Sequence, residues 1–133
     1  GLVGSEMCIR DSLILVAEDD DSNFKLIKAI IGKKCDIQWA KNGEEIVALF
    51  KEYGKEAKAI LMDIKMPVMN GLDATKIIRE ENKEIPIIMQ TAYAFSSDKE
   101  NAMNAGASEV LVKPITLSIL RGTLTKYFPE LVW

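Results

Sequence analysis

Acidic, hydroxyl and ammonium side chains stand at the ends of short apolar runs in this chain. They are Glu18, Asp19, Asp63, Thr91 and Lys113. Two or three carboxylates within a few ångströms of one another repel, so they need a cation or an extra proton. A set of oxygen ligands suits Mg²⁺, which keeps several waters and accepts one or two carboxylates together with phosphate oxygens. These residue types therefore indicate a magnesium site that handles phosphate.

A carboxylate beside Mg²⁺ can act as a nucleophile toward a phosphoryl group and form an aspartyl-phosphate. Asp63 is the candidate nucleophile, and Glu18 and Asp19 are the candidate metal ligands. Thr91 and Lys113 would neutralise the equatorial phosphoryl oxygens together with the metal. Each residue alone also has an ordinary interpretation: a solvated turn, a packed threonine or a surface lysine. Because all of them stand at strand ends, the ordinary interpretations would require several coincidences at one edge of the sheet.

Composition excludes several other kinds of site. The chain has 133 residues, a net charge of −3 and no histidine, which rules out histidine-based triads, metal sites and general bases within it. Direct nucleic-acid binding is not expected, because it needs clustered Lys and Arg. Membrane contact is not expected either, since no apolar run approaches the roughly 20 residues of a membrane span. Cys8 and Cys35 form no disulfide framework or zinc pattern, and a buried free thiol at Cys35 fits a cytoplasmic location.

Five short strands are predicted to position these side chains. Their predicted bounds are Leu13–Ala17, Asp36–Ala40, Ala59–Met62, Ile87–Thr91 and Glu109–Val112. Four of them are apolar runs with β-branched residues, which is typical of strands covered on both faces. Asp36–Ala40 alternates instead and is expected at the edge of a sheet.

A helical pattern follows each strand. The predicted caps are one of Asp20, Asp21 and Ser22 for the first helix, then Asn42, the capping box Ser97–Glu100 and Thr116, and a further helix is expected to follow Gly71. The predicted stops include Gly32, Gly54 and Gly106. Alternating strands and helices with short connections imply right-handed crossovers and a parallel sheet. The predicted fold class is therefore α/β, a doubly wound, flavodoxin-like (βα)5 fold with a five-stranded parallel sheet in the order 2-1-3-4-5. Ligands of such sheets lie outside the carboxyl ends of the strands, where the candidate residues stand.

The first dozen residues look foreign to this pattern. Residues 2–12, LVGSEMCIRDS, resemble the translation of a transposon-end adapter used in making sequencing libraries. A short natural leader or tag is the alternative. We therefore expect a non-native leader at residues 1–12 and a single domain at residues 13–133.

Four segments resemble the receiver domains of bacterial response regulators. They are ILVAED at 14–19, LMDIKMPVMNG at 61–71, QTAYA at 90–94 and GASEVLVKPI at 106–115. Together they extend the resemblance over about residues 13–128.

The resemblance implies a role for each matching position. Asp63 would be phosphorylated, while Glu18 and Asp19 would hold Mg²⁺ directly or through water. The backbone carbonyl of Lys65 would complete the metal shell, and Thr91 and Lys113 would bind the phosphoryl group. The Lys113–Pro114 bond is similar to the family's cis peptide.

The expected function is a phosphoacceptor switch of a two-component phosphorelay, with no catalysis beyond its own phosphorylation and slow autodephosphorylation. The donor would be a phosphohistidine on a histidine kinase or a histidine phosphotransfer domain. The loops resemble those of hybrid histidine kinases, and a single-domain regulator is the alternative. Val110 stands where the family usually has a Tyr or Phe switch, so we expect a monomer or a weak dimer.

Two other functions compete with this one. A Mg²⁺-dependent phosphohydrolase with an aspartyl-phosphate intermediate is the main alternative, but such enzymes of the haloacid-dehalogenase family carry a second Asp where this chain has Lys65. A flavin carrier would need a phosphate-cradling loop after the first strand, where this chain has the four acids 18–21. Both alternatives are disfavoured by those residues.

Overall fold

The computed structural model describes residues 13–32, 35–92, 96–113 and 115–127. Strands and helices alternate along them as β1 Leu13–Ala17, α2 Asp21–Ile31, β2 Asp36–Ala40, α3 Gly43–Tyr53, β3 Ala57–Asp63, α4 Gly71–Glu81, β4 Ile87–Thr91, α5 Ser96–Ala105, β5 Glu109–Val112 and α6 Leu117–Tyr127. The predictions for residues 1–12 and for the Lys113–Pro114 peptide lie outside the described residues, as do residues 93–94 and 128 of the resemblance.

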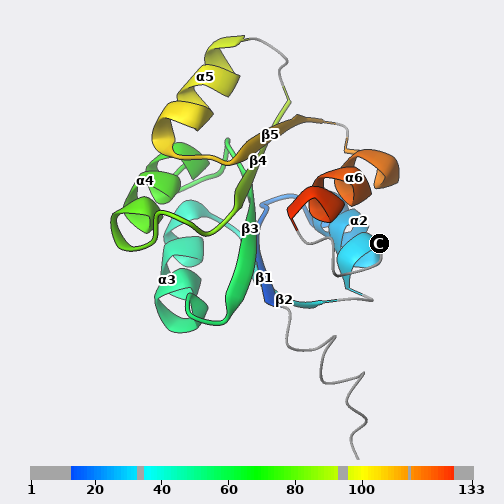
Figure 1. Ribbon diagram of the computed structural model, residues 1–133, viewed down its shortest axis with the longest axis horizontal. Coiled ribbons are helices and arrows are strands. Elements are labelled where there is room, and N and C mark those ends of the chain that lie inside the picture. The colour runs from blue at the N-terminus through cyan, green and yellow to red at the C-terminus, as the bar shows by residue number, and fades with distance from the viewer. Residues whose placement is uncertain (1–12, 33–34, 93–95, 114, 128–133) are drawn as a thin grey trace, which may run out of the picture.

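The strands form one parallel sheet in the order β2-β1-β3-β4-β5. This order confirms the predicted one and places β1 beside β3. Helices α3, α4 and α5 cover one face of the sheet, and α2 and α6 cover the other (Figure 1). Within the described parts of the chain, no helix combines the length and the apolar character needed to cross a membrane.

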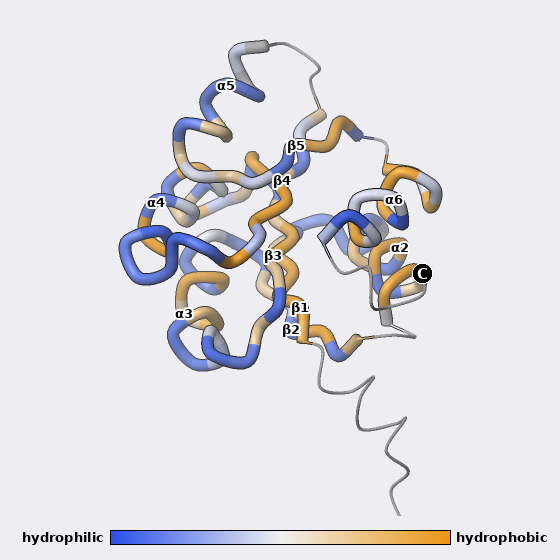
Figure 2. The backbone as a smooth tube through the Cα atoms, in the orientation of Figure 1, coloured by the Kyte–Doolittle hydropathy of each residue, from blue (hydrophilic) through white to orange (hydrophobic). Residues whose placement is uncertain are grey.

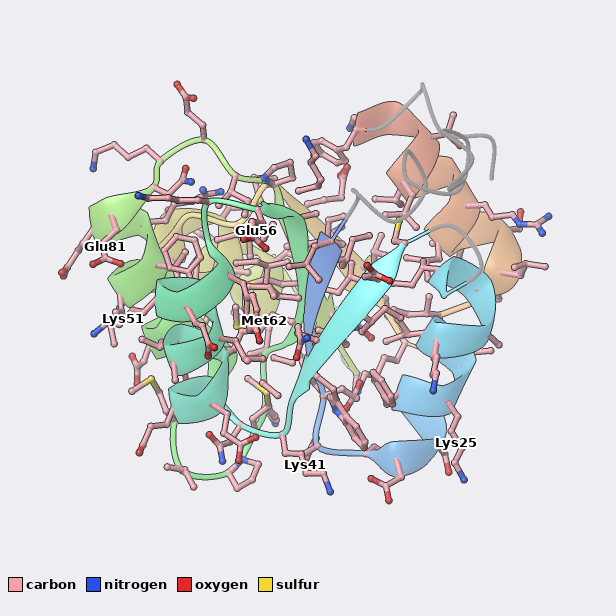
Figure 3. All side chains as sticks on the ribbon, turned by 90° about the horizontal axis from the view of Figure 1, so that it is seen from below. Lys25, Lys41, Lys51, Glu56, Met62 and Glu81 are labelled. Carbon is pink, nitrogen blue, oxygen red and sulfur yellow. The ribbon has the colours of Figure 1, made fainter. Side chains whose placement is uncertain are left out.

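Two apolar cores lie on the two faces of the sheet, because successive side chains of a strand point to opposite sides. Leu15 and Met62 belong to the core beneath α3, α4 and α5, whereas Ile14 and Leu61 belong to the core beneath α2 and α6. Figure 2 shows the hydrophobic residues along the strands between the two helical layers, and Figure 3 labels Met62 between the sheet and α3. Burial on both faces explains the unbroken apolar runs of the inner strands.

The edge strand β5 departs from this pattern. The sequence predicted a strand covered on both faces, but Val110 and Val112 are half-buried. The reason is its position at the edge, since among the described strands β5 pairs with β4 alone. Val110 pairs with Met89 of β4 and packs against the core beneath α5.

Two helix starts differ from the predicted ones, and a third selects among the predicted candidates. Of the three candidates, Asp20 caps α2, and its carboxylate accepts a hydrogen bond from the Ser22 N–H at 2.8 Å. Asn70 caps α4, so Gly71 is the first helical residue. Helix α5 begins at Ser96, which puts Ser97 inside the helix, so the predicted capping box there is wrong. A cap needs extended backbone with its oxygen aimed at the first N–H groups, and neighbouring polar residues compete for that position.

The other helix boundaries agree with the sequence. The Asn42 side chain accepts from the Glu45 N–H at 2.8 Å, and the Thr116 hydroxyl accepts from the Ile119 N–H at 3.2 Å. Gly32, Gly54 and Gly106 follow the ends of α2, α3 and α5.

The loop between β3 and α4 contains a tight turn centred on Val68. The Met69 N–H donates to the Pro67 carbonyl at 2.7 Å, and Val68 has a φ of 69°. A left-handed backbone is unfavourable for a β-branched residue, and a turn of this kind is strained. Val68 is 75% exposed, so its side chain gains little packing in return.

Replacing Val68 should relieve this strain. We expect Val68→Gly to raise the free energy of unfolding by about 1 kcal/mol, because glycine adopts positive φ without a steric penalty. Urea denaturation would measure the change. Val68→Ala is the matched control, since it keeps a Cβ and should gain less. A glycine variant no more stable than the alanine variant would contradict the assignment of strain to this turn.

Candidate functional site

Three carboxylates meet at the carboxyl ends of β1 and β3. Glu18 and Asp19 directly follow β1, and Asp63 is the last residue of β3, which is longer than predicted at both ends. The two strands are paired in register, with Ala17 opposite Met62. One oxygen from each of the three carboxylates lies within 4.8 Å of the others. The sheet therefore brings together the acids that the strand-end pattern singled out.

Lys113 directly follows β5, and its side chain extends to the same cluster. Its Nζ lies 2.7 Å from Oδ2 of Asp63 and 3.5 Å from Oε1 of Glu18. The Lys113 N–H donates to the Thr91 carbonyl at 2.7 Å, which fixes where the lysine side chain leaves the main chain. The pocket thus combines three carboxylates with one ammonium.

Burial makes the electrostatics of the pocket unusual. Glu18 is fully buried and Asp63 is 5% exposed. Burial and the charge of Asp63 raise the pKa of Glu18 to about 7, although Lys113 acts in the opposite direction. Burial disfavours the charge on Lys113, but its hydrogen bond to Asp63 and the charges of both acids outweigh this and raise its pKa above the usual value. The pocket therefore holds a proton near neutral pH unless another cation replaces it.

The first turn of α2 helps to hold Glu18. The Asn23 side-chain amide donates to Oε1 of Glu18 at 3.3 Å, and the Asp20 N–H donates to Oε2 at 3.2 Å. Sequence reasoning did not single out Asn23. Its amide lies beside Glu18 because α2 starts at Asp21, whereas the sequence left the cap of this helix open among three neighbouring residues.

The start of α4 packs tightly against the main chain at Asp63. The Gly71 N–H donates to the Ile64 carbonyl at 2.8 Å, and a Cβ on Gly71 would lie 2.2 Å from the Asp63 carbonyl oxygen. The start of α4 can approach the strand end this closely because the residue there is glycine.

Thr91 and Lys65 lie near the cluster, but their predicted roles depend on bound groups. Thr91 ends β4 at the same edge of the sheet and is 3% exposed. Lys65 lies two residues after Asp63 and is exposed. Binding of a phosphoryl group by Thr91 and of a metal by the Lys65 carbonyl stay predictions.

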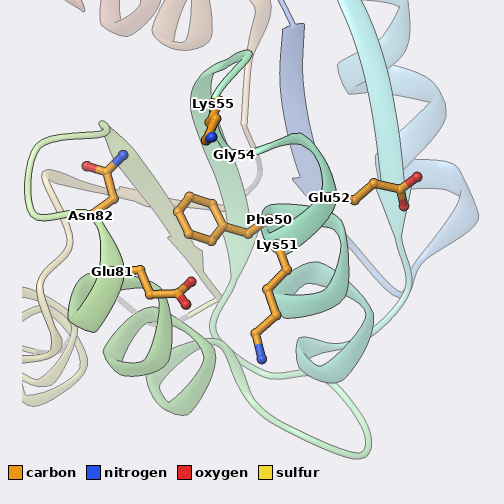
Figure 4. Close-up of a pocket in the computed structure, with 7 residues that line it drawn as sticks. All are labelled: Phe50, Lys51, Glu52, Gly54, Lys55, Glu81 and Asn82. Carbon is orange, nitrogen blue, oxygen red and sulfur yellow. The ribbon is translucent and has the colours of Figure 1, made fainter.

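A separate cavity of about 570 Å³ lies between the C-terminal ends of α3 and α4 (Figure 4). It is lined by Phe50, Lys51, Glu52, Gly54, Lys55, Glu81 and Asn82. Its lining mixes both signs of charge and includes none of the predicted site residues.

Similar sequences place the chain among known proteins. The family model for the response regulator receiver domain matches residues 14–125. Hybrid signal transduction histidine kinase I of Dictyostelium discoideum is 41% identical over 96% of this chain, which spans 8% of that kinase. Polar-differentiation response regulator DivK of Brucella anthropi is 30% identical over 88% of this chain and 96% of its own length. The relatives include a eukaryote, so the bacterial origin expected from the resemblance stays a prediction.

Solved structures share the fold. The receiver domain of a sensor histidine kinase from Pseudomonas aeruginosa, which carries a magnesium ion in its active-site cleft, has a TM-score of 0.80 and 31% identity, covering 88% of this chain and 97% of that one. The chemotaxis protein CheY4 of Vibrio cholerae has a TM-score of 0.80 and 26% identity, covering 87% of this chain and 98% of that one. These neighbours confirm the predicted flavodoxin-like fold.

The raised pKa of Glu18 predicts how stability depends on pH. Because its folded-state pKa of about 7 exceeds the ordinary 4.5, the folded protein binds more protons than the unfolded chain between these values. The stabilising contribution of this group is complete below the lower value and is lost as the pH rises through the upper one. With EDTA present, we expect the free energy of unfolding to fall between about pH 5 and about pH 8.

Glu18→Gln should flatten this pH dependence, as measured by urea denaturation across the same range. Glu80→Gln, at an exposed position of α4, is the matched control and should keep the wild-type slope. Equal slopes for wild type and Glu18→Gln would show that Glu18 is not the group responsible.

Proposed function

The chain belongs to the response regulator receiver domain family, and from this premise we propose that it accepts a phosphoryl group on Asp63 in a two-component phosphorelay. The observation that carries the proposal is the pocket itself. Three carboxylates lie within 4.8 Å of one another, and the Lys113 ammonium lies 2.7 Å from Asp63. That arrangement supplies a nucleophile, a cation and the ligands for a metal.

The residues present fit a magnesium ion. Carboxylate oxygens at this spacing are the hard ligands that Mg²⁺ accepts, and the surplus of negative charge in the pocket favours a divalent cation. We propose that Glu18, Asp19 and Asp63 hold the ion, with the Lys65 carbonyl completing its shell. When bound, the metal would neutralise charge on the incoming phosphoryl oxygens.

The transfer itself would use groups of this chain. An oxygen of the Asp63 carboxylate forms a bond to phosphorus, and the bond from phosphorus to the donor nitrogen breaks, with its electron pair leaving on the nitrogen. Lys113 would move from the Asp63 carboxylate to a phosphoryl oxygen, and the Thr91 hydroxyl would donate to another. We propose that the domain turns over no other substrate. After phosphorylation it would only lose the phosphoryl group slowly.

The proposed donor is a phosphohistidine on a histidine kinase or a histidine phosphotransfer domain. This chain has no histidine, so the donor lies in another domain or protein. The Dictyostelium relatives at 41% and 39% identity are both hybrid histidine kinases, of which this chain spans 8% and 4%. We therefore propose that it serves as the receiver of a hybrid kinase.

A cytoplasmic location is part of the same proposal. It is supported by Cys35, a free and buried thiol, because thiols stay reduced in the cytoplasm.

The signal leaving the site should be modest. Val110 is β-branched, so its χ1 angle is restricted, and it already packs against the core beneath α5. It has no ring that could swing on phosphorylation. We propose that the face formed by α5, β5 and α6 changes little and that the domain is a monomer or a weak dimer.

Acetyl phosphate or phosphoramidate with Mg²⁺ should add one phosphoryl group, labile in alkali and in hydroxylamine. Intact mass would measure the adduct. Asp63→Asn should abolish it, while Asp73→Asn, at an exposed position of α4, should label like wild type. Equal labelling of wild type and Asp63→Asn would refute the assignment. Sustained turnover of small phosphate esters would instead indicate the phosphohydrolase.

Mg²⁺ should stabilise the domain by mass action, since it would bind the folded protein and relieve repulsion among the acids. We expect the melting temperature to rise with millimolar Mg²⁺. Asp19→Asn should reduce the rise, and Asp21→Asn, an exposed residue outside the cluster, should leave it intact. Melting curves that Mg²⁺ leaves unmoved would show that the pocket is not a metal site.

A further inference from the structure

Trp39 of the edge strand β2 is bound to the loop that carries the candidate metal ligands. Its indole Nε1 donates to the main-chain carbonyl of Glu18 at 2.8 Å. The Glu18 N–H donates in turn to the Ala40 carbonyl at 2.9 Å. Both main-chain polar groups of Glu18 are therefore bound to β2, one through a neighbouring main chain and one through a side chain.

The Glu18 carbonyl belongs to the planar peptide group that joins Glu18 to Asp19. The orientation of this one group influences where both acidic side chains leave the main chain. Rotating it would break the hydrogen bond from Trp39. The donors to the Glu18 carboxylate are longer, at 3.2 Å from the Asp20 N–H and 3.3 Å from Asn23, and Asp19 is exposed. The indole thus makes the shortest of these contacts.

The indole is itself held in place. The Phe24 ring stacks on it with centroids 3.9 Å apart and planes inclined by 2°. Lys41, which follows β2 and is labelled in Figure 3, has its Nζ 4.9 Å from the Trp39 ring centroid. Such contacts restrict the ring to one orientation. Since Phe24 lies on α2, the stacked pair joins β2 to α2 across the loop of residues 18–20.

We propose that Trp39 is a positioning residue that sets the Mg²⁺ affinity of the pocket through its hydrogen bond to the Glu18 carbonyl. The inference rests on the proposed function, because it requires the acidic cluster to bind Mg²⁺. Without the indole N–H, the peptide group between the two acids can turn, and the metal would have to order it on binding. Removing a contact that orients metal ligands typically weakens metal binding by about tenfold or more.

The test compares Mg²⁺ dissociation constants, measured by calorimetry, of wild type and two altered proteins. Trp39→Phe keeps a ring that can stack on Phe24 but has no N–H. Replacement of Trp39 by 3-benzothienylalanine keeps the two-ring shape and has sulfur in place of the N–H. Both should bind Mg²⁺ about tenfold more weakly than wild type. The benzothienyl protein should keep the metal-free melting temperature of wild type, which separates positioning from general stability.

Lys41→Gln is the matched control, because it removes the cation near the ring and leaves the N–H intact. It should bind Mg²⁺ like wild type. If wild type itself fails to bind Mg²⁺, the proposed function fails and this inference with it. If wild type binds and the benzothienyl protein binds equally well, the inference alone is overturned. Equal weakening in Lys41→Gln would overturn it too, since the N–H would not be the cause. Should Trp39→Phe fail to fold, the benzothienyl protein decides.

Discussion

Repulsion among buried carboxylates is the constraint on which the site depends. Three acids lie within 4.8 Å of one another, with one ammonium 2.7 Å from Asp63, and Glu18 is fully buried. Acids at this spacing cannot all ionise without a counter-charge. Burial and the charge of Asp63 therefore raise the pKa of Glu18 to about 7. We propose that the pocket exchanges this proton for a metal ion, and that the metal and Lys113 neutralise the further negative charge of a phosphoryl group.

The rest of the fold holds this unfavourable arrangement in place. The inner strands β1 and β3 are buried on both faces, so their ends cannot move apart without exposing two apolar cores. Gly71 packs against the Asp63 carbonyl, and the first turn of α2 donates to Glu18. The edge strand adds Trp39, whose indole binds the peptide group between the two metal-ligand candidates. Strong burial at the centre thus supports strained or repulsive features at one end of the sheet, including the left-handed turn at Val68.

Much of this could be predicted from the sequence. Apolar runs located the strands. Since ligands gather at the carboxyl ends of parallel strands, the sequence also predicted that Glu18, Asp63 and Lys113 lie together, as they do in the structure. The remainder depends on packing that no local pattern encodes. Asp20 competed with two neighbouring polar residues for the cap of α2, so the exact start of this helix stayed open and Asn23 was missed. No sequence pattern indicated the role of Trp39, because its side chain contacts the main chain of Glu18, a residue distant in the sequence. Positive φ at Val68 was equally hidden, since valine is a residue that normally avoids it.

We propose that Asp63 carries the phosphoryl group and that Mg²⁺ bound in the acidic pocket makes this possible. The most direct measurement is to incubate the domain with a phosphohistidine-bearing donor domain, reduce with borohydride and sequence the peptides by mass spectrometry. Borohydride converts an aspartyl-phosphate to homoserine, which marks the residue itself. We expect homoserine at position 63 when Mg²⁺ is present and its loss in EDTA. Homoserine at another aspartate, or labelling at position 63 that is indifferent to Mg²⁺, would contradict it.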